Sequence, residues 1–153
     1  MLCYTELPEG EYLCKDIEIS IGGKYRINPC STRVSAMPYN RFWSGAQRPD
    51  TQTEEAYFFS FTADGPTEIE VRLSRDFETA VVRPLSQNIV PEISGDMIKF
   101  TVPGAGHYVL EADDFHNALH IFANAPIEQP DGDTLVFKGG VHHIGVMRLE
   151  SNQ

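Results

Sequence analysis

Strict alternation of apolar and polar residues in short segments is the feature that most constrains what this chain folds into. Residues 16–21, 67–73 and 97–102 each place an aliphatic or aromatic side chain at every second position. Because successive side chains of a strand point to opposite faces of a sheet, each segment predicts a strand with one core face and one solvent face. No window has the sustained i, i+3, i+4, i+7 apolar pattern of a helix, apart from a weak match at residues 113–120.

Turn residues separate these segments at short intervals. Gly22-Gly23 predicts a hairpin between two strand segments, and Asp64-Gly65-Pro66 and Ser94-Gly95-Asp96 predict further turns. Many short strands without helical crossovers indicate an all-β fold, a sandwich or a barrel. We predict an antiparallel β-sandwich, immunoglobulin-like or jelly-roll-like, of about 10–12 short strands. The segments concerned are residues 16–21, 24–27, 32–36, 56–61, 67–73, 79–83, 88–93, 97–102, 107–111, 118–122, 134–138 and 146–150.

The alternation also predicts which side chains fill the core. Within residues 118–122, we expect Leu119 and Ile121 to face one way and His120 and Phe122 the other. The residues predicted to form or flank the core are Ile69, Val71, Leu73, Ile98, Phe100, Val102, Val109, Ile121 and Phe122.

The length of 153 residues fits one domain that needs neither a metal nor a disulfide to be stable. We expect an irregular segment at residues 1–16, a β-sandwich domain at residues 17–145 and a separate last segment at residues 146–153. In that last segment a strand-like stretch leads into a turn, so we expect the chain to be the N-terminal part of a longer protein. The net charge of −10 argues against nucleic acid and anionic membranes as partners, because both attract clusters of Lys and Arg.

The three cysteines, Cys3, Cys14 and Cys30, show no CxxC spacing. Because an odd number fits no closed disulfide framework, we predict three free thiols. The first 25 residues contain neither a basic stretch nor an apolar one, so no signal peptide is visible. These features predict a cytoplasmic protein, or an extracellular or periplasmic one if a signal has been trimmed from this chain.

Residues 37–48 form an aromatic loop sequence that contains the only tryptophan of the chain, Trp43. The apolar residues follow neither a strand nor a helix period, and Pro38 and Gly45 favour a loop. Large aromatic rings are unfavourable in water, so this loop is expected to be covered. Three roles are open: a carbohydrate platform, a contact with another domain, and packing on its own sandwich. The candidate residues for the first two roles are Tyr39, Asn40, Arg41, Phe42, Trp43, Gln47 and Arg48.

Two short patterns suggest a metal site, and neither is complete. Asp131-Gly132-Asp133 could begin a calcium loop, but the further spaced carboxylates and the closing Glu are absent. His116 and His120 are four residues apart, but residues 118–122 are a predicted strand, on which such a pair lies about 13 Å apart. The side chains of His142-His143 point to opposite faces of an extended chain. No nucleophile motif of the G-x-S-x-G type is present. We therefore predict no metal, no cofactor and no catalytic residue.

Several short motifs follow one another between residues 33 and 142 in an order that resembles a known family. They are Arg33-Val34-Ser35-Ala36-Met37-Pro38-Tyr39-Asn40, Trp43-Ser44-Gly45, Gln47-Arg48-Pro49, Val82-Arg83-Pro84-Leu85, Ile98-Lys99-Phe100, Leu119-His120-Ile121-Phe122-Ala123 and Gly140-Val141-His142. Together they resemble the N-terminal β-sandwich domain of parallel-β-helix glycoside hydrolases, the dextranase and isopullulanase type with their polygalacturonase-like relatives. The resemblance spans most of residues 17–150.

In that family the sandwich precedes a right-handed β-helix that carries the catalytic aspartates. The resemblance therefore implies that residues 146–153 begin a truncated β-helix and that no catalytic residue lies in this chain. It implies a non-catalytic accessory domain, which packs against the β-helix of a parent enzyme that hydrolyses O-glycosyl bonds in polysaccharide. The alternative is a stand-alone carbohydrate-binding module that uses residues 39–48, with polysaccharide as its partner. An intact small enzyme is a weaker third interpretation.

Overall fold

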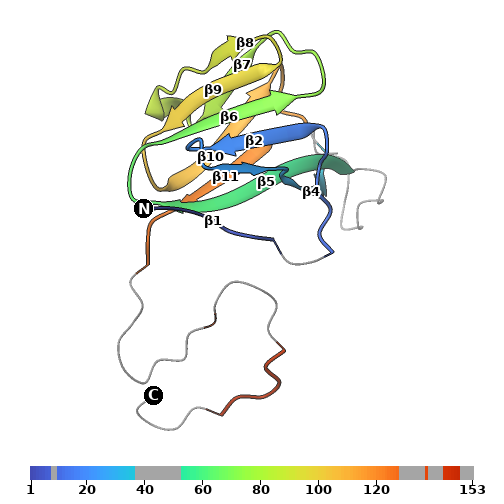
Figure 1. Cartoon of the computed structure of the whole chain (residues 1–153). Coiled ribbons are helices and arrows are strands. Elements are labelled where there is room, and N and C mark those ends of the chain that lie inside the picture. Colours follow the sequence, from blue (N-terminus) through green and yellow to red (C-terminus); the bar gives the residue numbers. More distant parts are fainter. Residues whose placement is uncertain (8–9, 37–52, 128–136, 138–142, 149–153) are drawn as a thin grey trace.

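The computed structural model of this chain describes residues 1–7, 10–36, 53–127, 137 and 143–148. The described residues up to Asn124 form two β-sheets that are stacked face to face (Figure 1). The predicted all-β sandwich is thereby confirmed. The described residues contain a single helical turn, η1 (Leu85–Gln87), and no helix among them is long and apolar enough to cross a membrane.

The two sheets differ in size. Sheet A consists of β1 (Leu2–Tyr4), β4 (Cys30–Ser35), β5 (Thr53–Ala63), β7 (Ala80–Arg83), β10 (Gly106–Ala112) and β11 (Leu119–Asn124). Sheet B consists of β2 (Ile17–Ile21), β3 (Tyr25–Ile27), β6 (Thr67–Leu73), β8 (Glu92–Ser94) and β9 (Met97–Val102).

The strand order makes β11 the central strand of sheet A. The order there is β1-β5-β11-β10-β7, and β4 pairs with β5 alongside β1. Sheet B runs β3-β2-β6-β9-β8. Every strand pair in the described part of the chain is antiparallel except that of β5 and β11, which run parallel with Phe59 opposite Ile121. This parallel pair is the one departure from the antiparallel sandwich that the sequence predicts.

The core lies between the sheets and follows the alternation of the strands. Seven of the predicted core residues are buried: Ile69, Val71, Leu73, Ile98, Phe100, Val102 and Ile121. The other two, Val109 and Phe122, are half-buried and flank the core on the outer side of sheet A. Leu119 and Ile121 point inward, whereas His120 and Phe122 point outward, as predicted.

The predicted hairpin at Gly22-Gly23 is present between β2 and β3. Both glycines have positive φ, 56° and 65°, and the amide of Lys24 donates to the carbonyl of Ile21 over 3.0 Å. Two consecutive positive φ angles are the signature of a type I′ turn, which glycine adopts without strain. At Gly22 a β-carbon would also lie 2.5 Å from Leu2 Cδ2, so a larger residue would require the Leu2 side chain to shift in addition to adopting positive φ.

Some segments differ from the prediction. Leu2–Tyr4 forms a strand inside the segment expected to be irregular, because it gains backbone partners along β5 from Ala63 to Phe61. Residues 88–91 are not a strand, since the helical turn η1 and Pro91 leave only Glu92–Ser94 to pair with β9. Described residues 143–148 form no strand, whereas one was expected from residue 146. Residues 134–136 and 138 lie outside the described part of the chain.

The three cysteines are free thiols, in agreement with the prediction from their odd number. Cys14 and Cys30 are buried, and Cys3 is exposed. Burial, together with the neighbouring Glu11 carboxylate, raises the pKa of the Cys30 thiol. The neutral thiol is therefore the favoured form of Cys30, which acts here as a small apolar side chain.

Candidate functional site

The sequence-predicted site residues lie outside the described part of the chain. Tyr39, Asn40, Arg41, Phe42, Trp43, Gln47 and Arg48 all fall within residues 37–52, so their role stays a prediction. The structure does fix where this segment is attached. Ser35 at the end of β4 and Thr53 at the start of β5 are paired with each other, so the segment leaves and re-enters sheet A at one point.

A histidine–carboxylate contact lies beside that attachment point. His116 Nδ1 is 2.5 Å from Glu54 Oε2, and the ring of Phe115 lies 4.2 Å from the imidazole, centroid to centroid. The contact ties the loop between β10 and β11 to the start of β5. No group of three or more His, Cys, Asp or Glu side chains in the described residues is arranged to hold a metal ion.

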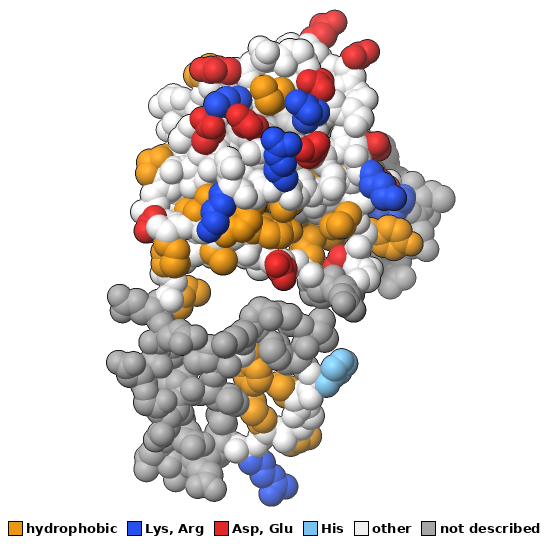
Figure 2. Space-filling model, in the orientation of Figure 1, with side chains coloured by type: hydrophobic (Ala, Val, Ile, Leu, Met, Phe, Trp, Pro, Cys, Tyr) orange, Lys and Arg blue, Asp and Glu red, His pale blue; other side chains and the backbone are white. Residues whose placement is uncertain are grey.

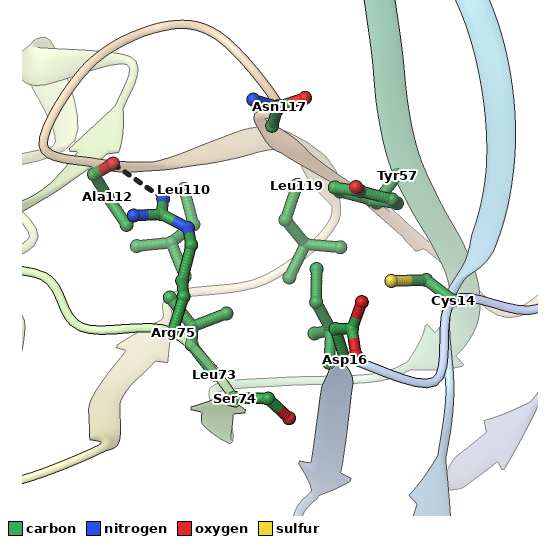
Figure 3. Close-up of a pocket in the computed structure, with 11 residues that line it drawn as sticks. Cys14, Asp16, Tyr57, Leu73, Ser74, Arg75, Leu110, Ala112, Asn117 and Leu119 are labelled. Carbon is green, nitrogen blue, oxygen red and sulfur yellow. Dashed lines mark hydrogen bonds between the residues drawn. The ribbon is translucent and has the colours of Figure 1, made fainter.

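A cavity of about 430 Å³ opens between the ends of the two sheets (Figure 3). Ile17, Leu73, Leu110 and Leu119 form its apolar floor, at the end of the core. Polar side chains surround the opening. Those that line it are Asp16, Tyr57, Ser74, Arg75 and Asn117.

Arg75 is held at the mouth of this cavity by the loop after β10. Its Nη2 donates to the carbonyl oxygen of Ala112 over 2.9 Å, and its Nη1 lies 3.5 Å from Asp113 Oδ2. The other carboxylate oxygen of Asp113 accepts from the amides of Thr79 and Glu78, over 2.9 and 2.7 Å. These amides, followed by the Arg75 guanidinium, hold the pKa of Asp113 below its ordinary value. One carboxylate thus fixes both the loop before β7 and the guanidinium.

Tyr57 forms the side wall of the cavity, and its phenol is difficult to ionise. Burial raises its pKa to about 12, and the neighbouring Cys14 and Glu55 side chains add to the rise. The hydroxyl donates to Glu55 Oε2 over 3.2 Å. A charged phenolate here would lose water and face the Glu55 carboxylate, so the phenol stays protonated.

This environment predicts an alkaline loss of stability that depends on Tyr57. An unfolded tyrosine ionises near pH 10, whereas folded Tyr57 keeps its proton to about pH 12. The stabilising contribution is therefore complete below pH 10 and falls as the pH rises toward 12, because only the unfolded state releases the proton. Urea unfolding at pH 9–12 should show a steeper alkaline decline for the wild type than for Tyr57→Phe. Tyr12→Phe, at an exposed tyrosine, serves as the control and should keep the wild-type decline.

The outer face of sheet B carries ion pairs typical of a solvated surface. Lys99 Nζ lies 2.9 Å from Glu68 and 3.3 Å from Glu70, and Arg26 lies 3.6 Å from Glu18. Figure 2 shows acidic and basic side chains interspersed over this face. Such exposed pairs contribute little stability and are compatible with contact to water.

The outer face of sheet A is different, because aromatic and uncharged side chains predominate on its central strands. Its Arg83–Glu111 ion pair, 3.0 Å between Nη2 and Oε2, lies toward the β7 edge. We use "outer face of sheet A" for these outward residues: Phe58, Ser60, Thr62, His107, Val109, His120, Phe122 and Asn124. The ring of Phe122 lies 6.5 Å from that of Phe58 and 5.0 Å from that of His107. Asn124 donates to Ser60 Oγ over 2.8 Å.

The ring geometry on this face favours a protein contact over a sugar platform. Phe122 meets Phe58 at an interplanar angle of 72° and His107 at 80°, so neighbouring rings stand edge to face. A flat glycan platform needs rings that lie coplanar in the surface. Edge-to-face rings instead form ridges and gaps, into which the side chains of another protein surface can pack.

Comparisons with known proteins found a solved structure with a similar fold. Neither a protein-family model nor a curated protein sequence matches the chain. A solved structure does. The chain has the fold of part of Dex49A from Penicillium minioluteum. The TM-score is 0.51 at 14% sequence identity, and the match covers 83% of this chain and 32% of Dex49A. This chain therefore spans about a third of that protein, and the likeness extends to the fold alone.

Sequence reasoning missed both the cavity and the outer face of sheet A. The run Tyr57-Phe58-Phe59 breaks the alternation, and that run was a signal that β5 is apolar on both faces. The polar residues of the cavity gave no such signal. Asp16, Arg75 and Asn117 lie in three separate loops, and only the packing of the two sheets brings them to one opening.

Proposed function

We propose that this chain is a non-catalytic accessory domain of a β-helix glycoside hydrolase that acts on polysaccharide, and that it packs against and supports the catalytic β-helix. The fold shared with a third of Dex49A supports this proposal, because in Dex49A a domain of this fold is one part of a longer chain. The order of motifs in the sequence supports the same class of protein independently. Residues 39–48 stay a predicted part of the contact.

The observation that carries the proposal is the unequal chemistry of the two outer faces. Sheet B presents ion pairs across its outer face, whereas sheet A presents Phe58, Val109 and Phe122 on its three central strands and has its Arg83–Glu111 ion pair toward the β7 edge. Surface charges are depleted, and aromatic residues enriched, at the centre of protein interfaces. The outer face of sheet A is therefore the surface that we assign to the β-helix.

The chain that follows the sandwich supports the same assignment. It leaves sheet A from the end of β11, the central strand of that sheet. Ile127 is 89% exposed and Val146 is 92% exposed, so the described residues after the sandwich present large apolar side chains without a cover. A neighbouring domain that buries them would gain about 25 cal/mol for each Å² of apolar surface.

The proposal predicts that the purified chain hydrolyses no polysaccharide. A glycosidase needs two carboxyl groups held at a fixed separation across the scissile bond, and the proposal places that pair on the β-helix. Reducing-end assays with dextran, pullulan and polygalacturonate should give the rate of a buffer blank. Turnover by the chain that a single Asp→Asn or Glu→Gln change abolishes would overturn the proposal.

A second measurement tests the supporting role directly. In a parent protein that continues from Gln153 into a β-helix, removal of residues 1–153 should lower the melting temperature of the remaining β-helix. If the truncated β-helix melts at the same temperature as the parent, the sandwich does not support it and the proposed role is wrong.

A further inference from the structure

The cavity between the ends of the sheets has the size and depth of a ligand site. Its volume of about 430 Å³ lies within the range of roughly 300–1,000 Å³ that small-molecule pockets occupy. Its floor reaches the core at Leu73 and Leu119, which are 6% and 3% exposed. Figure 3 shows these side chains between the polar groups of the opening. A ligand that enters here therefore meets an apolar base below a polar rim.

Three polar side chains of this rim have no partner among the described residues. The Asp16 carboxylate, the Ser74 hydroxyl and the Asn117 amide line the cavity, and none of them makes a hydrogen bond or an ion pair there. Together they offer a charged acceptor, a hydroxyl that donates and accepts, and an amide that does both. Asn117 is held in the left-handed region, at φ 54°, a conformation that is rare outside glycine.

We propose that this cavity binds one residue of a neutral saccharide. The C–H faces of a sugar ring match the apolar floor and the side of the Tyr57 ring, while its hydroxyls match the donors and acceptors of the rim. A purely apolar ligand fits less well, because it would displace water from Asp16 and Asn117 without replacing the hydrogen bonds that the water makes.

The charges around the opening select a neutral sugar over a uronate. Arg75, the one cation among the described residues that line the cavity, is already paired with the Asp113 carboxylate and the Ala112 carbonyl. Asp16 has no such compensation among the described residues. A bound uronate would place its carboxylate near Asp16 within a chain of net charge −10, and like charges repel at such short range.

This site is separate from the surface assigned to the β-helix. The cavity opens between the sheet ends, whereas Phe122 and its neighbours lie on the outer side of sheet A. Saccharide binding therefore does not rest on the proposed function, and the two can fail independently.

The test is a titration of the ¹⁵N-labelled chain with isomaltotriose, maltotriose and trigalacturonate, followed by amide chemical shifts. We expect one of the two neutral sugars to shift the amides of Asp16, Tyr57 and Asn117, and trigalacturonate to leave them unchanged. Asp16→Ala should weaken the binding by about tenfold, because a charge-assisted hydrogen bond is lost. Ser74→Trp, which adds a large side chain at the exposed mouth, should abolish it.

Glu92→Ala is the matched control, because it removes an exposed carboxylate on β8, which does not line the cavity. It should bind the sugar like the wild type. The proposal is overturned if no sugar shifts the cavity amides, or if trigalacturonate binds more tightly than the neutral sugars. It is also overturned if shifts appear only at the Trp43 indole, since the aromatic loop would then be the sugar site.

Discussion

Replacement of Phe59 by alanine is expected to lower the free energy of unfolding of this domain by roughly 3–5 kcal/mol, the usual cost of truncating a buried phenylalanine. Phe59 is fully buried at the centre of β5. Its ring stacks on that of Phe61, with centroids 6.0 Å apart, and Ile121 of β11 lies opposite it in the parallel pair. Because protein interiors are close-packed and relax only in part around a deleted side chain, the change is expected to leave a cavity.

The neighbouring residue supplies the control for this experiment. Phe58 is the same residue type on the same strand, but it lies on the outer face of sheet A and is only half-buried. Phe58→Ala should cost about 1 kcal/mol in the isolated chain, mainly through its edge-to-face contact with Phe122. Urea unfolding of the two variants measures the difference. Equal losses would contradict the assignment of Phe59 to the core and Phe58 to the surface.

The same pair of residues shows why part of the fold can be predicted from the sequence and part cannot. In β6 and β9 apolar and charged residues alternate, so the core faces follow from the period alone. In β5 the run Tyr57-Phe58-Phe59 gives no period. Which ring points inward is decided by the register with β11, and that register joins residues about 60 positions apart in the sequence.

Long-range pairing also explains the elements that the sequence analysis did not anticipate. The three residues of β1 are too few to show a period, and they become a strand only because β5 extends far enough to pair with them. Likewise, the parallel pairing of β5 with β11 has no local signal in either strand. It is seen only in the long-range register that sets Phe59 opposite Ile121.

The aromatic loop could be recognised from the sequence, whereas the cavity could not, because only the loop has an unusual local composition. An aromatic loop such as residues 37–48 is conspicuous because its composition is unusual at one place in the sequence. The cavity is built from common polar residues, and its floor is the ordinary end of the core. Sites of that kind arise from the arrangement of loops in space, which composition and period do not encode.

The second large loss of stability is expected when Phe122 is replaced by alanine, and its size depends on whether the β-helix is present. In the isolated chain Phe122→Ala should cost about 1 kcal/mol, since the ring is half-buried and contacts His107 and Phe58 at its edges. In a parent protein with the β-helix attached, the same change should cost about 2 kcal/mol more, because a central aromatic anchor of an interface is lost. Urea unfolding of both forms, monitored by far-ultraviolet circular dichroism, measures the two values.

Met97→Ala is the matched control for Phe122→Ala. Met97 is also half-buried and apolar, but it lies on the outer face of sheet B, among the ion pairs that face solvent. Its replacement should change the isolated chain and the parent protein by the same small amount. If instead Met97→Ala shows the larger cost in the parent protein and Phe122→Ala does not, the β-helix packs on sheet B. A charged sheet face would then be the interface, and the unequal chemistry of the two faces would need another cause.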